Sequence, residues 1–263
     1  MNHLAASELI LNEDGSIYHL NLRPEQLADT VILVGDQDRV QKITKYFDNV
    51  ELVVKKREFH TQTGTYKGKR ISVLSTGIGT DNIDIVMNEL DALVNIDFKT
   101  RQIKEEKTSL NIVRVGTSGS VQKEIPVDSI VVSTLAVGFD SLLHFYQSEG
   151  VQLHDFNEAL DKHLNIYSRN SKPYVVESDA ELAEKFISSE VFEGFTGTNV
   201  GFYAPQGRVL RLPLQDETLR DKIASFSFKD RKITNLEMET SAIFGLGKLL
   251  GHKTLSLNAI IAN

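Results

Sequence analysis

The chain has 263 residues, of which 41% are hydrophobic and 25% charged, a balance typical of globular proteins. Its formal net charge is −7, so it has no excess of positive charge for general nucleic-acid binding. The absence of cysteine excludes disulfides and thiolate chemistry. No basic segment precedes the early apolar residues, and no apolar run is long enough to span a membrane. We therefore expect a cytoplasmic protein with no signal peptide and no membrane partner.

Residues 1–20 show little periodicity and predict an N-terminal arm. After it, strand and helix patterns alternate along the chain. Apolar, β-branched runs predict buried strands at Thr30–Val34, Asn111–Val115, Ser129–Val137 and Thr254–Ala262. Helical spacing of apolar residues predicts helices near 40–47, 82–94, 179–189 and 240–250. This alternation predicts an α/β fold, with one domain over residues 1–263 and a central mixed β-sheet flanked by helices.

Two further segments have distinct patterns. Strand-forming residues at Glu51–Glu58 and Thr65–Thr76, broken at Gly64, Lys67 and Gly68, predict antiparallel ribbons. Residues 206–234 carry scattered charges and predict a mobile flap beside the site.

Two carboxylates lie two residues apart in Asn235-Leu236-Glu237-Met238-Glu239-Thr240-Ser241, just before the helix predicted at 240–250. If the backbone is extended there, both side chains reach the same space. An ionised carboxylate can then accept hydrogen bonds from two neighbouring hydroxyls, such as those of a ribose. The alternative is that both acids only favour the helix N-terminus electrostatically.

Arginines occur at three predicted strand ends, in Gly35-Asp36-Gln37-Asp38-Arg39, Arg57-Glu58-Phe59 and Arg114-Val115-Gly116-Thr117. Ligands gather at the carboxyl ends of strands in open α/β sheets, and a guanidinium fork suits phosphate. Each arginine alone is more typical of a structural salt bridge, and the glycines alone fit ordinary βα loops. Together the three stretches predict an oxyanion site.

The stretch Phe202-Tyr203-Ala204-Pro205-Gln206-Gly207-Arg208 follows a glycine-rich strand at Gly197–Gly201. An aromatic face can stack on a base, and an amide and a guanidinium can read its polar edge. In the alternative interpretation, the aromatic residues belong to the core and Pro205 marks a loop.

These stretches, in this order and spacing, resemble the motifs of the nucleoside phosphorylase family from about residue 17 to the end of the chain. Asn235–Ser241 is similar to the ribose-binding signature, and Phe202–Arg208 to the uracil-reading loop of the uridine phosphorylase branch. Gly35–Arg39 resembles the phosphate loop, except that Gln37 replaces the usual proline. The resemblance implies a nucleoside phosphorylase-like fold from which the family's C-terminal helix is absent, either because a tail is missing from the sequence or because the protein is truncated.

The resemblance also assigns roles to residues. Phosphate would be bound by Gly35, Arg39, Arg114 and Thr117, and by Arg57 across a subunit interface. The ribose would be bound by Glu237, Met238 and Glu239, and by His19 from an adjacent protomer. The base would be bound by Phe202, Gln206 and Arg208, with Arg211 as a competitor for the guanidinium role. Arg114, Glu239 and Arg208 would carry catalysis.

We therefore expect a homo-oligomeric pentosyltransferase, a dimer or hexamer, that uses uridine and phosphate as substrates. No acid follows the strand ending Ile260-Ile261-Ala262-Asn263, where the purine branch usually has one, and this favours a pyrimidine. The alternatives are a purine nucleoside phosphorylase, a nucleosidase of the same fold and a catalytically silent nucleoside-binding protein. We expect no cofactor and no transition metal. Glu58, Ile78 and Asn82 match a monovalent-cation site of some relatives in part, because Asn82 replaces the usual serine.

Overall fold

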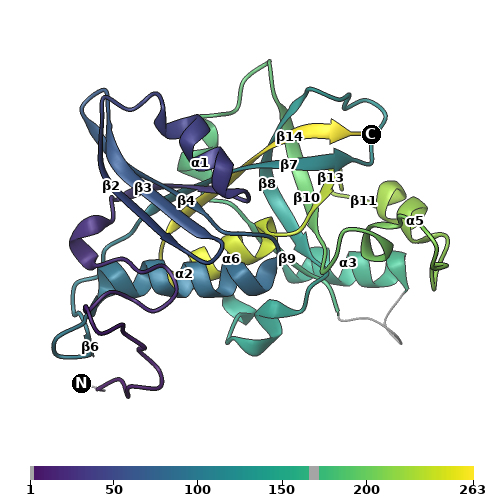
Figure 1. Ribbon diagram of the computed structural model, residues 1–263. Coiled ribbons are helices and arrows are strands. Elements are labelled where there is room, and N and C mark those ends of the chain that lie inside the picture. Colours follow the sequence, from purple (N-terminus) through teal and green to yellow (C-terminus); the bar gives the residue numbers. More distant parts are fainter. Residues whose placement is uncertain (1–2, 166–171) are drawn as a thin grey trace. The chain divides into compact units, whose positions relative to one another are not determined.

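The computed structural model describes residues 3–165 and 172–263 (Figure 1). The chain divides into two compact units. Unit 1 comprises Met1–Gly77, Asn82–Val113 and Leu250–His252, and unit 2 comprises Ile78–Asp81, Arg114–Leu249 and Lys253–Asn263. Each unit is assembled from three separate stretches of chain. The expectation of one domain over residues 1–263 stays a prediction.

Unit 1 contains a sheet with strand order β1-β4-β3-β2. Strands β1 and β4 are parallel, whereas β3 is antiparallel to both β4 and β2. Helix α1 lies against β3 and β4 in Figure 1, with its apolar face, which includes Val40, buried. The elements of this unit are β1 (Thr30–Val34), α1 (Gln37–Thr44), β2 (Asn49–Lys56), β3 (Phe59–Tyr66), β4 (Lys69–Ser75), β5 (Ile96–Asp97), β6 (Gln102–Ile103), the 3₁₀ turn η1 (Pro24–Gln26) and most of α2 (Thr80–Asn95).

Unit 2 contains most of the remaining elements. They are β7 (Asn111–Ser120), β8 (Ile130–Gly138), η2 (Leu142–Phe145), η3 (Glu149–Val151), α3 (His154–Leu164), β9 (Tyr174–Glu177), α4 (Ala180–Glu184), β10 (Phe192–Thr198), η4 (Ala204–Gln206), α5 (Leu219–Ser225), β11 (Ser227–Phe228), β12 (Arg231–Lys232), β13 (Asn235–Glu237), α6 (Thr240–Leu250) and β14 (Lys253–Ala262).

Five strands of unit 2 close into a ring. They follow the order β13-β10-β8-β14-β7, and β13 also pairs with β7. Strand β10 is parallel to β8 and β13, whereas β14 is antiparallel to β8 and β13 is antiparallel to β7. Apolar residues of α3 and α5, including Leu160 and Ile223, form one core with residues of β8 and β10. Parallel and antiparallel pairs in both units, with helices against the strands, confirm the expected α/β fold with a mixed sheet.

Most predicted elements are present, with shifted ends. The helix predicted at 40–47 begins earlier, at Gln37, because the Asp36 side chain accepts a hydrogen bond from the Asp38 amide and caps it. The predicted break at Gly64 is wrong, since this residue lies inside β3. A side chain there would come within 2.1 Å of the Asn49 carbonyl, so glycine allows β2 to approach.

Two other predictions need correction. The helix predicted at 179–189 ends at Glu184. The prediction of a mobile flap over 206–234 is wrong for its second half, where α5 and the β11–β12 ribbon are formed. Ile223, Phe226 and Ile233 from this half are buried in the unit 2 core, which a sequence with scattered charges conceals.

Within the part of the chain that the structure describes, no helix is long and apolar enough to cross a membrane.

Candidate active site

Glu237 ends β13 and forms the turn that leads into α6. Its carboxylate accepts hydrogen bonds from the backbone amides of Glu239 and Thr240, at 3.0 to 3.1 Å. The hydroxyls of Thr198 and Thr240 also donate to it, at 2.7 and 2.9 Å. Glu237 is buried, and this burial raises its pKa although Arg114 opposes the shift. The contacts of Glu237 therefore fit the alternative role from the sequence analysis, in which the acid stabilises the N-terminus of the helix.

Glu239 has a different environment, although it is also buried. One of its carboxylate oxygens accepts a hydrogen bond from the Gly79 amide at 2.8 Å, and the other lies 2.5 Å from the Arg114 guanidinium. It accepts fewer bonds than Glu237, so it retains capacity for other donors. Met238, between the two acids, is half-buried.

Arg114 lies in β7 and is 6% exposed. Its Nη2 contacts Glu239 and lies 3.3 Å from Glu237, while its Nη1 donates to the Asn258 side-chain oxygen at 2.8 Å. Burial alone would lower the pKa of this guanidinium, but the two carboxylates outweigh that effect and raise it. Arg114 is thus a fixed, buried cation, as the need of a buried arginine for an anionic partner predicts.

Gly116 makes this position of Arg114 accessible. A side chain at Gly116 would begin 1.9 Å from Arg114 Nη1, so only glycine leaves room for the guanidinium. Thr117 follows on β7 and is half-buried. Of the five predicted phosphate residues, Arg114 and Thr117 belong to unit 2, and Gly35, Arg39 and Arg57 belong to unit 1.

In unit 1 the loop after β1 is joined to the turn between β2 and β3. The Gln37 side chain donates to the Arg57 carbonyl at 2.7 Å, which brings two of the predicted phosphate segments together. Arg57 is exposed and has a φ of 54°, a left-handed conformation that is uncommon in a residue with a side chain. Gly35 accepts a backbone bond from Gly77 at 3.1 Å, and Arg39 is half-buried in α1.

His60 contacts this loop through its imidazole ring. Its Nδ1 lies 3.2 Å from the Gln37 carbonyl, and its Nε2 lies 3.2 Å from the Gln62 amide nitrogen. The Gln62 oxygen accepts from Thr44, so the amide nitrogen donates to Nε2 and the ring is neutral. Burial lowers the pKa of His60 below 6.5, in keeping with this tautomer.

His19, the predicted ribose ligand of an adjacent protomer, belongs to unit 1 and is held by Glu89 of α2. The distance from His19 Nδ1 to Glu89 Oε1 is 2.7 Å. Glu89 also accepts from the backbone amides of His19 and Leu20, at 2.8 to 3.1 Å. These bonds hold the ring through Nδ1, and the His19 side chain is 26% exposed. Sequence reasoning missed Glu89 because nothing distinguishes it from other acids on an amphipathic helix.

The predicted base-binding residues Phe202, Gln206 and Arg208 form one cluster around η4. Gln206 is buried, its amide nitrogen donates to the Gly201 carbonyl at 3.1 Å, and its oxygen accepts from Arg208. Arg208 also donates to the Phe202 carbonyl at 2.8 Å, and its guanidinium stacks 4.2 Å from the centre of the Phe202 ring. The alternative assignment of Phe202 and Tyr203 to the core is wrong, because each is 52% exposed.

The guanidinium of Arg208 also approaches β7. A side chain at Gly119 would lie 3.1 Å from Arg208 Nη2. The pKa of Arg208 is lowered by burial and by the nearby Arg220 charge, which makes this cation receptive to negative charge. The competitor Arg211 is exposed.

Several buried polar residues of unit 2 escaped the sequence analysis. Asn258 contacts Arg114, as described above. Asp140 accepts hydrogen bonds from Tyr174 at 2.8 Å and from Ser241 at 2.9 Å, and its burial raises its pKa. A polar residue in an apolar strand is a weak signal for Asn258, whereas Asp140 lies in a segment without clear periodicity.

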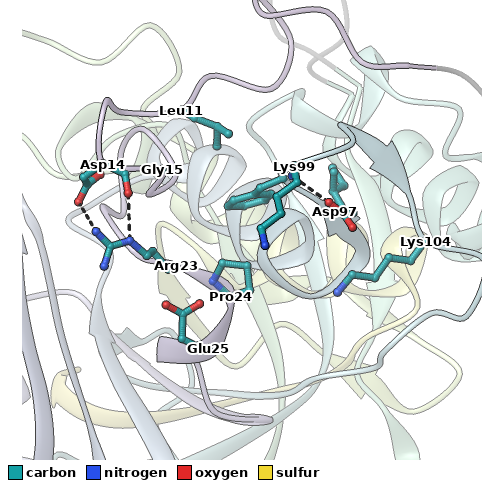
Figure 2. Close-up of a pocket in the computed structure, with 11 residues that line it drawn as sticks. Leu11, Asp14, Gly15, Arg23, Pro24, Glu25, Asp97, Lys99 and Lys104 are labelled. Atoms are coloured by element: carbon teal, nitrogen blue, oxygen red, sulfur yellow. Dashed lines mark hydrogen bonds and ion pairs between the residues drawn. The ribbon is translucent and has the colours of Figure 1, made fainter.

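The residues described contain no group of three His, Cys, Asp or Glu side chains that could hold a metal ion. Glu58 and Asn82 both lie beside Gly77, and the monovalent-cation match stays a prediction. Figure 2 shows a pocket of about 540 Å³ between the N-terminal arm and the β5–β6 ribbon, where Arg23 bonds Asp14. None of the predicted site residues lines it.

Comparison with known proteins agrees with these motifs. A sequence model of the Phosphorylase superfamily matches residues 29–263. The chain is 28% identical over 261 residues to a uridine phosphorylase of Thermococcus kodakarensis, covering 95% of this chain and 79% of that one. It is also 28% identical over 242 residues to a DeoD-type purine nucleoside phosphorylase of Bacillus subtilis, covering 91% and 84%.

A solved structure gives the same result. The Trypanosoma brucei nucleoside phosphorylase, described as showing uridine phosphorylase activity, aligns with a TM-score of 0.86 and 27% identity, over 96% of this chain and 90% of that chain. The chain therefore belongs to the phosphorylase superfamily. The resemblance to nucleoside phosphorylases, and with it the expectation of an enzyme, is confirmed.

Proposed function

We propose that this protein is a uridine phosphorylase, which cleaves uridine with inorganic phosphate to give uracil and ribose 1-phosphate. The observation that carries the proposal is the pairing of Gln206 and Arg208 in the η4 loop. The Gln206 amide offers an acceptor and donors, which match the ring N–H and a carbonyl oxygen of uracil. Arg208 only donates, which suits the uracil oxygen that gains negative charge as the base departs.

The reaction needs a positive sugar and a nucleophilic anion close together. Cleavage of the glycosidic bond gives the ribose oxocarbenium character, and bound phosphate stabilises this charge before it attacks the anomeric carbon. Glu239 and the Met238 backbone hold the ribose hydroxyls, while Arg114 and Thr117 orient the phosphate. The 2.5 Å contact between Arg114 and Glu239 supports this scheme, because adjacent groups can place the two substrates side by side.

Glu237 has a supporting part in this scheme. Its carboxylate already accepts bonds from two backbone amides and two hydroxyls, so it fixes the turn that carries Glu239. No residue acts as a covalent nucleophile, since phosphate itself attacks the sugar.

The complete site is shared between protomers of a homo-oligomer in the cytoplasm. His19 and Arg57 match family residues that reach a neighbouring site, and both belong to unit 1. The partly exposed His19 side chain and the exposed Arg57 side chain are compatible with donation to a partner. We expect an active dimer or a hexamer, and light scattering that gave an active species of monomer mass would remove this part of the proposal.

A purine nucleoside phosphorylase is the second candidate. The Bacillus subtilis purine enzyme is as similar in sequence, at 28%, as the Thermococcus kodakarensis uridine enzyme. The two candidates share the phosphate and ribose contacts and differ in the base loop.

One assay separates the candidates. Uridine, cytidine, inosine and methylthioadenosine are incubated with and without phosphate, and free base is measured by chromatography. Phosphate-dependent release of uracil alone is expected. Release of hypoxanthine at a similar rate would favour the purine enzyme, release without phosphate a nucleosidase, and no release a silent binder.

Replacement of Gln206 by alanine tests the base contact directly. Loss of the amide leaves the uracil edge unpaired, and an unpaired buried polar group costs about 1–3 kcal/mol. We therefore expect kcat/KM for uridine to fall roughly 10- to 100-fold, so that the preference over cytidine shrinks. Arg211→Ala is the matched control, because Arg211 is an exposed arginine of the same loop. Unchanged base preference in Gln206→Ala would contradict the uracil assignment.

A further inference from the structure

A buried belt of polar side chains runs around the ring of strands in unit 2. It passes from Arg114 to Asn258, then to Ser133, Thr196, Asn235 and Ser118, through hydrogen bonds of 2.6 to 3.0 Å. Every strand of the ring contributes to it, and all of these residues are at most 6% exposed. A buried polar network of this kind is stable only when its members are paired, and each of these is.

Asn258 occupies the place in the belt next to the charged site. Its side-chain oxygen accepts from Arg114 Nη1 at 2.8 Å, while its nitrogen donates to the hydroxyls of Ser133 at 3.0 Å and Ser256 at 3.1 Å. The residue has no exposed surface, and the amide orientation is fixed because the hydroxyls hold its nitrogen side.

The two anchors of Arg114 differ in what a substrate does to them. Glu239 holds Nη2 as an ion pair, but Glu239 is also the group that would accept the ribose hydroxyls. A ribose would therefore compete with Arg114 for this carboxylate. Asn258 lies on the Nη1 side, is neutral and is enclosed by protein, so neither substrate competes for it.

A second series of hydrogen bonds connects Asn258 to the turn that contains Glu237 and Glu239. Ser256 bonds both Asn258 and the Thr240 hydroxyl, and Thr240 donates to Glu237 at 2.9 Å. The guanidinium and the turn that carries Glu239 thus share one support that does not depend on their direct ion pair.

We propose that Asn258 is a positioning residue that holds the Arg114 guanidinium in the orientation for phosphate while Glu239 engages the ribose. This inference rests on the proposed function, since it deepens the role of the same site. The neutral amide matters because a third carboxylate beside Arg114 would cancel the positive charge that attracts the anion. Gly116 complements Asn258 because a side chain at Gly116 would begin 1.9 Å from the same Nη1 atom that Asn258 binds.

Two substitutions of Asn258 test the proposal, one by removing a hydrogen bond and the other by adding a charge. Asn258→Leu removes the bond to Arg114 at similar size. Asn258→Asp keeps the shape and can accept from Ser133 and Ser256, but adds negative charge. We expect the KM for phosphate to rise roughly tenfold in Asn258→Leu and further in Asn258→Asp, with the KM for uridine within about twofold of the original.

Ser133→Ala is the matched control, because Ser133 bonds the far side of the same amide and does not contact Arg114. It should lower the melting temperature while changing neither KM value by more than about twofold. A merely structural role for Asn258 predicts that both KM values rise together, and that Asn258→Asp, the closer match in shape, is the milder variant. That pattern, or unchanged phosphate KM values, would overturn the proposal while the proposed function stands.

Phosphate binding to the intact proteins, measured by calorimetry, tests the role of Asn258 separately from the proposed function. If the unmodified protein released no base from any nucleoside, the proposed function would fail. The role of Asn258 would then be supported by weaker phosphate binding in Asn258→Leu and Asn258→Asp. It would be overturned by equal binding in all variants, or by no phosphate binding to the unmodified protein.

Discussion

The two units hold their predicted phosphate arginines in opposite ways. In unit 2, Arg114 is buried and its guanidinium is fixed by the side chains of Glu239 and Asn258. In unit 1, Arg57 has an exposed side chain, and its main-chain carbonyl is the atom that Gln37 holds. Unit 2 therefore fixes a guanidinium group, whereas unit 1 fixes the backbone turn that carries an exposed guanidinium group.

This difference fits the two roles that the family resemblance implies. A charge that acts within its own subunit can be preorganised, because its partners, like Glu239 and Asn258 for Arg114, lie in the same unit of the chain. A charged side chain that is donated to a neighbouring subunit must remain exposed until the subunits assemble. The chain can therefore fix only the backbone from which this side chain extends. We therefore expect substitutions at the Arg114 site to affect stability and activity together, and substitutions around Arg57 to affect mainly activity.

Replacement of Arg114 by alanine should have the largest effect. It leaves Glu237 and Glu239 buried without their cation, and breaking such a buried pair costs about 3–5 kcal/mol. We expect phosphate-dependent turnover to be lost and the free energy of unfolding, measured with urea, to fall by about this amount.

Arg231→Ala provides the control for that experiment. Arg231 pairs with Glu193 at 2.5 Å, but both side chains are more than a quarter exposed, so its loss should cost no more than about 1 kcal/mol. If Arg114→Ala were as stable as Arg231→Ala, the picture of Arg114 as a buried, preorganised charge would be wrong.

Replacement of Glu239 by glutamine should have the next largest effect. The amide keeps the shape and can still accept from Gly79, but the negative charge that suits a cationic sugar is lost. We expect kcat to fall about 10- to 100-fold, and the KM for uridine to change less, because the charge matters most in the transition state. Steady-state kinetics measure both values. A rise in KM with kcat intact would reduce Glu239 to a passive binding group.

The sequence predicted the positions of these groups better than their partners. The Asn235–Ser241 stretch and Arg114 were visible because they interrupt otherwise regular patterns, although β7 continues to Ser120 and Arg114 lies inside this strand rather than at its predicted end. Their partners Asn258, Glu89 and Asp140 were not, because long-range pairs arise from strand register and helix facing. The ring closure of β13 onto β7 has the same origin, since a three-residue strand gives almost no local signal.

Substitution of Gln37 should have a smaller effect, confined to unit 1. Gln37 is the first residue of α1, where proline is well tolerated, so Gln37→Pro should fold normally and lose only the bond to the Arg57 carbonyl. We expect stability within about 0.5 kcal/mol of the original and a several-fold higher KM for phosphate, because the Arg57 turn is released. Gln37→Glu tests the bond further, since a carboxylate cannot donate to that carbonyl. An unchanged phosphate KM in both variants would mean that the tether does not position Arg57.

The smallest effect on stability should come from the titration of His60, which contacts the Gln37 carbonyl. Its neutral ring donates to the Gln37 carbonyl and accepts from Gln62, and Lys55 and Asp38 are the charged groups that act on it. Because its pKa in the folded protein is below 6.5, the unfolded chain binds the proton more readily. The contribution of His60 to stability is therefore complete above pH 6.5 and is lost as the pH falls through the folded-state pKa.

His60→Gln should flatten this part of the dependence of the urea-unfolding free energy on pH. Arg114 does not titrate in this range, so the Asn258 variants should retain the slope. A slope that survives in His60→Gln would assign it to another group and contradict the role of His60.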